Sequence, residues 1–125
     1  MESGIIYLTT SFDGEATPLQ QDAVSYIPFE LIYSGGSNFV VEGRYSDIEG
    51  FNWNEASIIP PGDLPKPDAA GPFNYTAIMP EVGTYYFRFR VHSEIDDTIS
   101  GESRELKVIV TEKVSKYPLV SEDAI

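Results

Sequence analysis

The sequence predicts an all-β protein, built as a sandwich or barrel of short antiparallel strands. Several segments alternate apolar and polar residues with the two-residue period of a half-buried strand, and the clearest of them is 84–92. Turn signals that contain glycine and proline separate these segments at short spacing. No segment sustains the i, i+3, i+4, i+7 apolar stripe of an amphipathic helix, so no helix is expected.

Six segments are expected to form strands, because each is rich in β-branched and aromatic residues. In chain order they are 4–12, 23–36, 38–46, 73–80, 84–92 and 103–112. Pro28 lies on the polar parity of the second segment, which favours a strand edge or a bulge there. The sequence SGGS at 34–37 predicts the turn that follows this segment.

Residues 46–72 form one long loop that is rich in proline and glycine. Because structureless loops of this length are uncommon in compact domains, we expect an extra strand within 54–60 and an extended, proline-stiffened stretch at 61–72. Phe51 and Trp53 in this loop have two interpretations. The preferred one is that Trp53 covers one end of the sandwich, and the other is that both rings are exposed and form a platform for sugar rings.

A chain of 125 residues corresponds to one domain and is long enough to bury its own core. We place this domain at residues 1–112. The tail, residues 113–125, contains apolar residues such as Tyr117 and Leu119 and is therefore not a plain polar linker. It is interpreted either as a connection to another domain or as an arm that docks on a partner.

The chain is strongly acidic, with 20 acidic residues, 8 basic residues and a net charge of −12. Nucleic acid phosphates and anionic lipids repel such a chain, so neither nucleic acid nor a membrane surface is an expected partner. The apolar runs are too short to cross a bilayer, so no membrane insertion is expected. The absence of cysteine excludes disulfides and thiolate metal sites.

No pattern of residues predicts catalysis, so we do not expect an enzyme. His92 is the single histidine, no G-x-S-x-G nucleophile elbow is present, and no pair of carboxylates has a distinctive spacing. P-loop and dinucleotide-binding motifs are also absent, so no cofactor is expected. The acidic turn 94–102 gathers oxygen ligands of the kind that calcium prefers, but we interpret it as a solvated hairpin turn and expect no metal site.

The start of the strand at 84–92 has a specific pattern, with an acidic residue, a glycine, a tyrosine and an apolar residue at alternate positions. These residues are Glu81, Gly83, Tyr85 and Phe87. Together with the later stretch RELKVIVTE, they resemble the last hairpin of immunoglobulin-like and fibronectin III-like domains of bacterial and phage surface proteins. The resemblance implies an Ig-like β-sandwich of about seven antiparallel strands, a tyrosine corner at Tyr85 and a non-catalytic module.

If 84–92 is the sixth strand of such a sandwich, the segments 38–46 and 103–112 flank it in one sheet. The outward side chains of this sheet would include Arg44, Tyr86, Arg88, Arg90 and His92. One account of them is cross-strand ion pairing with Glu42 or Glu105. The other is a docking face, because arginine and tyrosine are enriched at the centres of interfaces.

We therefore expect a structural or interaction module in a virion or another surface assembly, for example a capsid decoration or an adhesion-type domain. Its expected partners are proteins of that assembly, including further copies of the chain, on a virion surface or an extracellular or cell surface. The alternative is a carbohydrate-binding module that uses exposed aromatic rings. The candidate binding residues are Arg44, Trp53, Tyr86, Arg88, Arg90 and His92.

Overall fold

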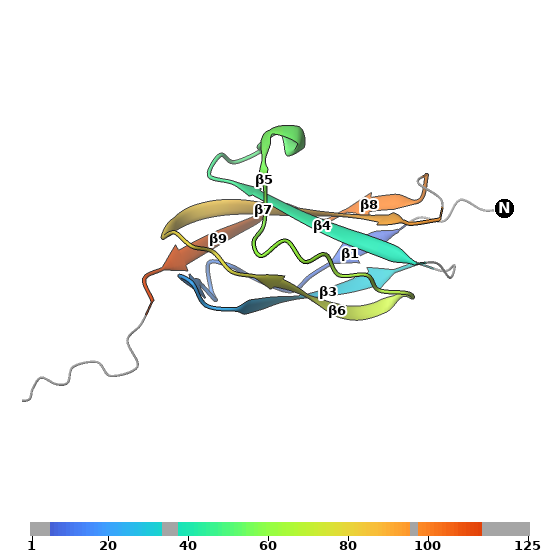
Figure 1. Cartoon of the computed structure of the whole chain (residues 1–125), viewed down its shortest axis with the longest axis horizontal. Helices are drawn as coiled ribbons and strands as arrows, with labels where there is room; N and C mark the ends of the chain where they lie inside the picture. Colours follow the sequence, from blue (N-terminus) through green and yellow to red (C-terminus); the bar gives the residue numbers. More distant parts are fainter. Residues whose placement is uncertain (1–5, 34–37, 96–97, 114–125) are drawn as a thin grey trace, which may run out of the picture.

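The computed structural model describes residues 6–33, 38–95 and 98–113, which fold into two β-sheets packed face to face (Figure 1). The smaller sheet has the order β1-β3-β6, with strands Tyr7–Thr9, Ser25–Ile32 and Gly71–Ala77. The larger sheet has the order β2-β9-β7-β4-β5, with strands Leu19–Gln20, Leu106–Thr111, Gly83–Ser93, Phe39–Ser46 and Ser57–Ile58. β8 (Ser100–Glu102) also pairs with β7. The predicted turn at 34–37 and most of the tail lie outside the described residues.

This arrangement is an all-β, immunoglobulin-like sandwich, as the sequence predicts. β7 pairs antiparallel with β4 on one side and with β9 on the other, which is the arrangement of strands C, F and G in that fold. β3 and β6 pair antiparallel in the opposite sheet, as strands B and E do. The extra strand expected within 54–60 is present as β5, at the edge of the larger sheet.

Two short strands and one turn of helix were not expected from the sequence. β2 pairs in parallel with β9, and β8 pairs antiparallel with β7, but they have only two and three residues. A two-residue alternation cannot show itself over such lengths. The 3-10 helix η1, Trp53–Glu55, is the one helical element of the described residues.

The first predicted strand is shorter than expected, because the chain changes sheets within the first twenty residues. β1 belongs to the smaller sheet, whereas β2 belongs to the larger one. The turn between them is closed by the Asp13 carboxylate, which accepts hydrogen bonds from the N–H of Glu15 at 3.0 Å and of Ala16 at 3.2 Å. Gly14 packs so tightly on β9 that a Cβ there would lie 2.4 Å from the carbonyl oxygen of Lys107.

The core between the sheets is built largely from aromatic rings. On β7 the inward residues Phe87, Phe89 and Val91 are fully buried, as the alternation in this segment predicts. The ring of Phe89 meets two rings of the smaller sheet edge-on, with centroid distances of 4.6 Å to Phe29 and 4.9 Å to Tyr75. Edge-to-face pairs of this kind contribute about 0.5–1.5 kcal/mol beyond the area they bury.

Gly43 in β4 leaves the space that these rings occupy. A Cβ at this position would lie 2.7 Å from Phe89 Cε2 and 2.8 Å from Ile59 Cδ1, closer than side chains approach each other. The hydroxyl of Tyr75 reaches across from the other sheet and accepts a hydrogen bond of 2.9 Å from the N–H of Gly43. Burial raises the pKa of this hydroxyl. The bond therefore satisfies a backbone donor in the dry interior.

The start of β7 forms the tyrosine corner that the resemblance implies. The Tyr85 hydroxyl donates to the carbonyl oxygen of Glu81, at 3.2 Å, four residues upstream. Gly83 has a φ of 154°, and a Cβ there would lie 3.3 Å from that hydroxyl. Desolvation, assisted by the negative charge of Glu81, raises the pKa of Tyr85. The alternating pattern read from the sequence thus corresponds to a real local structure.

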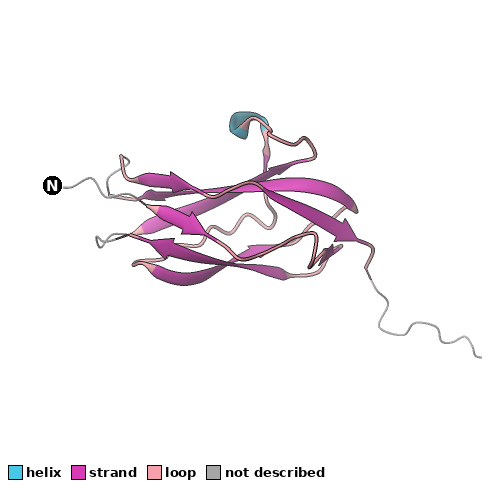
Figure 2. Cartoon of the chain, turned by 180° about the vertical axis from the view of Figure 1, so that it is seen from behind, coloured by secondary structure: helices cyan, strands magenta, loops and turns pink. Residues whose placement is uncertain are grey.

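The proline-rich stretch covers part of the open edge of β4. The N–H of Val41 donates to the carbonyl oxygen of Pro65 at 3.0 Å, and that of Phe39 donates to Pro67 at 2.9 Å. Because proline has no N–H, these two positions accept bonds from β4 but have no donor for a further strand. In Figure 2 this stretch is part of the pink loop that leads from the larger sheet to the smaller one.

We predict that Tyr75→Phe destabilises the protein by about 1–3 kcal/mol, because it leaves the N–H of Gly43 buried without a partner. Urea unfolding measures the change. The matched control is Tyr26→Phe, which alters a ring that is 63% exposed and should leave the unfolding midpoint unchanged. Equal midpoints for Tyr75→Phe and wild type would contradict the importance of this bond.

Candidate binding face

Charged side chains from β4, β7 and β8 gather on the outer surface of the larger sheet. We call this surface the arginine face, and define it by Glu42, Arg44, Arg88, Arg90, His92, Glu102 and Glu105. The strand register places Arg44 opposite Arg88, and it places Glu42 and Glu102 on either side of Arg90. The structure thus brings together the predicted outward residues of β4 and β7. Tyr86 lies nearer the N-terminal end of β7, half-buried and opposite Lys107 of β9.

The loop that follows β4 folds back over this face and is held there by arginines. Arg44 Nη1 donates to the carbonyl oxygen of Trp53 at 2.8 Å, and Arg88 Nη2 donates to the carbonyl oxygen of Phe51. In addition, the N–H of Gly50 donates to both carboxylate oxygens of Glu105, at 3.0 and 3.2 Å. Three backbone groups of the loop are therefore bonded to side chains that project from the sheet or its connecting segment.

The rings of this loop lie against the same guanidinium groups. The guanidinium carbon of Arg88 is 4.3 Å from the centroid of the Phe51 ring, and those of Arg44 and Arg90 are 5.0 and 4.3 Å from the Trp53 ring. Cation–π contacts contribute about 0.5–2 kcal/mol, more when they are desolvated. The loop and the arginines therefore form an additional layer on top of the larger sheet.

Ion pairs complete this layer. They join Arg44 to Glu42 at 2.8 Å, Arg88 to both Glu102 and Glu105 at 3.5 Å, and Arg90 to Glu102 at 3.6 Å. The pairing of Arg88 with Glu105 is one of those expected from the sequence. Exposed pairs contribute about 0.2–1 kcal/mol each, but the Arg88 side chain is only 20% exposed and contacts two carboxylates. The role of Arg88 is therefore mainly structural.

The alternative interpretation of this loop, in which both aromatic rings are exposed as a platform for sugars, is wrong. Phe51 is 6% exposed and Trp53 is 8% exposed. Trp53 begins the 3-10 helix, which is capped by the side chain of Asn52 through a 3.0 Å hydrogen bond from the N–H of Asn54. The preferred interpretation, that Trp53 is a covering residue, is correct, but its position is not the predicted one. The ring covers the face of the larger sheet and not the end of the sandwich, because Arg44 and Arg90 hold it there.

A hollow of about 480 Å³ remains open at the border of this layer. It is lined by Glu42, Trp53, Arg90, Val91, His92, Ser100, Gly101 and Glu102. The Arg90 side chain is 46% exposed, and His92 is exposed beside it. The sequence pattern does not predict the contribution of β8 to this hollow, because β8 is only three residues long. A guanidinium, an imidazole, two carboxylates and one indole ring therefore line the same hollow.

The described residues set limits on the chemistry of this surface. Among them, no group of three or more His, Cys, Asp or Glu side chains could hold a metal ion. Two carboxylates of the acidic turn, Asp96 and Asp97, lie outside the described residues. No helix in the described ranges is long and apolar enough to span a membrane.

Fold and face together define an immunoglobulin-like β-sandwich with a charged outer sheet face. No protein-family model matches the sequence, and no curated protein matches it. Among solved structures, the chain is similar to the ASH / PapD-like domain of human CEP192 (PapD-like domain 7), with 8% sequence identity and a TM-score of 0.42. The similarity covers 88% of this chain and 87% of that one.

We predict that the fluorescence of Trp53, the single tryptophan, is blue-shifted and poorly quenched by acrylamide. Arg44→Ala should increase quenching, because it removes both a contact with the ring and the hydrogen bond to the Trp53 carbonyl. Lys66→Ala, which alters an exposed side chain paired with Glu94, is the control and should leave quenching unchanged. Emission like that of free tryptophan in the folded wild type would contradict the covered position.

Proposed function

We propose that this chain is a non-catalytic interaction module whose contact site is the hollow bordered by Trp53, Arg90 and His92. The observation that carries the proposal is that the three arginines of this face make different contacts. Arg44 and Arg88 are bonded to the loop, whereas Arg90 keeps almost half of its side chain accessible at the rim of the hollow. Because Arg90 stands on the long central strand, its position is set by the sheet.

The chemistry of the hollow favours a protein segment with a carboxylate beside an apolar side chain. An accessible guanidinium forms charge-assisted hydrogen bonds with carboxylates, and His92 stands two residues further along the same strand. Glu102, 3.6 Å from Arg90, offsets part of this positive charge. Short-range bonds to Arg90 and apolar contact with the rim of Trp53 therefore supply more of the recognition than long-range attraction does.

We further propose a virion or cell-surface assembly as the setting. The resemblance to surface-protein domains supports this, and a net charge of −12 keeps such a module soluble and away from nucleic acid and anionic lipid. The glycan alternative needs flat rings that a sugar can reach. Phe51 and Trp53 are buried beneath guanidinium groups and offer no open ring face on which a sugar could stack, so we favour protein partners.

Selection of a random-peptide phage library on the folded, immobilised chain tests the contact site. We predict enrichment of peptides that carry an acidic residue next to an apolar one, with binding that Arg90→Glu reduces about ten-fold or more. The control variant Lys66→Glu makes the same change of charge at a side chain that is 65% exposed, and it should bind normally.

Two results would refute the proposed site. One is that no peptide is enriched on the wild type, and the other is that Arg90→Glu and Lys66→Glu bind the selected peptides equally. Because Arg90→Glu also removes a contact with Trp53, tryptophan emission must show that the loop stays in place. Arg90→Gln, which avoids a new negative charge beside Glu102, is the second variant.

A further inference from the structure

The outer face of the smaller sheet has a hollow at the point where the β1 ladder ends. β1 pairs with β3 as far as Thr9, which lies opposite Glu30, and the chain then crosses to the larger sheet. The hollow beside this crossing has a volume of about 430 Å³. Its lining includes Thr9, Thr10, Ser11, Pro28, Glu30 and Pro72. Three hydroxyls, one carboxylate and two proline rings therefore meet in one depression.

Local hydrogen bonds fix the wall of this hollow and leave polar groups available in it. The Thr10 hydroxyl donates to the carbonyl oxygen of Pro28 and accepts from the N–H of Phe12 at 3.0 Å, so the segment after β1 is tied to β3. Among the described residues, neither the exposed Glu30 carboxylate nor the Ser11 hydroxyl forms a hydrogen bond or an ion pair. A carboxylate accepts hydrogen bonds at both oxygens, so the hollow is suited to a ligand with hydroxyl donors.

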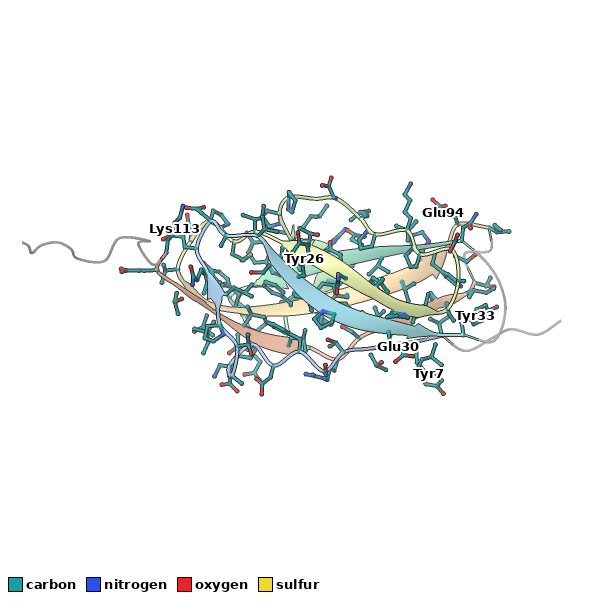
Figure 3. All side chains as sticks on the ribbon, turned by 90° about the horizontal axis from the view of Figure 1, so that it is seen from below. Tyr7, Tyr26, Glu30, Tyr33, Glu94 and Lys113 are labelled. Atoms are coloured by element: carbon teal, nitrogen blue, oxygen red, sulfur yellow. The ribbon has the colours of Figure 1, made fainter. Side chains whose placement is uncertain are left out.

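Two exposed tyrosine rings stand on either side of the hollow. Tyr26 is 63% exposed and Tyr7 is 55% exposed. Tyr26 lies two residues before Pro28 on β3, and Tyr7 lies opposite Ile32, two residues after Glu30. Tyr26 and Ile32 are thus six positions apart, which corresponds to about 20 Å along the strand. Figure 3 looks onto this face and labels both tyrosines and Glu30.

This face is almost without charge, although the chain as a whole is strongly acidic. The outward side chains of its three strands are Tyr7, Thr9, Tyr26, Pro28, Glu30, Ile32, Pro72, Asn74 and Thr76. Glu30 is the one charged group among them, so these side chains offer no cation to an anionic ligand, and a net charge of −12 repels one. The face is therefore suited to a neutral ligand.

We propose that this face binds a neutral oligosaccharide, with one sugar in the hollow and its neighbours on the tyrosine rings. A sugar ring has a face of C–H groups and a rim of hydroxyls. The C–H face packs on the flat rings of tyrosine and proline, while the rim hydroxyls donate to the Glu30 carboxylate. Proline and tyrosine lose little side-chain entropy when they bind a ligand, which favours affinity.

Other classes of ligand fit this hollow less well. A purely apolar ligand would cover the Glu30 carboxylate without supplying a donor. An extended peptide that binds as an added strand needs an open backbone edge, but the hollow lies over β3, which is paired on both sides. The site lies on the opposite sheet from the arginine face, where the rings are buried, and it does not depend on the proposed function.

A printed array of oligosaccharides tests the proposal on the full chain. The array carries neutral oligosaccharides of glucose, mannose, galactose and N-acetylglucosamine, and carboxylated ones. We expect binding to neutral members only. Titration calorimetry with the neutral oligosaccharide that binds best then compares variants. Tyr26→Ala removes a stacking ring and Glu30→Gln removes the charged acceptor, and each should raise the Kd about ten-fold or more.

The control variants make similar changes elsewhere on the surface. Glu112→Gln removes an exposed carboxylate that follows β9, and Ile58→Ala shortens a side chain in β5 that is 48% exposed. Both should bind the oligosaccharide like the wild type. Arg90→Glu should also bind it normally, which separates this site from the hollow of the arginine face.

A wild type that binds no neutral oligosaccharide of the array overturns the proposal, even if a protein partner covers this face. So does a Kd that either Tyr26→Ala or Glu30→Gln leaves unchanged. Binding that is lost in Arg90→Glu but kept in Tyr26→Ala would assign the sugar to the arginine face and also overturns it. Unchanged Trp53 emission in Tyr26→Ala and Glu30→Gln shows that the sandwich has folded.

Discussion

The missing side chain at Gly43 is the constraint on which the rest of the sandwich depends. It admits the ring of Phe89 and the hydroxyl of Tyr75 to the same small volume, and these two residues come from opposite sheets. The flanking residues of β4, Glu42 and Arg44, necessarily point the other way, onto the arginine face. The packing inside the sandwich therefore also sets where the charged groups outside it stand.

On this face, guanidinium groups provide the packing contacts that apolar side chains provide in the core. They hold the rings of Phe51 and Trp53, bond to carbonyl groups of the same loop, and are in turn neutralised by carboxylates. A solvent-facing sheet thus gains a third layer without adding apolar surface to the exterior. This layer also limits which arginine can bind a partner. Arg44 and Arg88 are bonded to the loop, whereas Arg90 remains accessible at the border of the layer.

The sequence was informative where a pattern repeats and uninformative where contacts join distant segments. Alternation at 84–92 predicted the burial of Phe87 and Phe89, and the spacing of Glu81 and Tyr85 predicted the tyrosine corner. The burial of Trp53 could not be predicted in the same way, because Arg90, which lies over its ring, is 37 residues further along the chain. Pro28 lies in the middle strand of its sheet and not at an edge, but beyond the end of the β1 ladder, where no N–H is required.

The unequal length of the outermost strands also governs how far association can extend. A fibril grows only if each unit offers two surfaces that can be joined in succession. Among the described residues, three of the four sheet borders are two or three residues long, and β4 is partly closed by proline carbonyls. A chain with one long border cannot be joined on both sides in succession, so this architecture guards an acidic, aromatic-rich protein against amyloid-like growth.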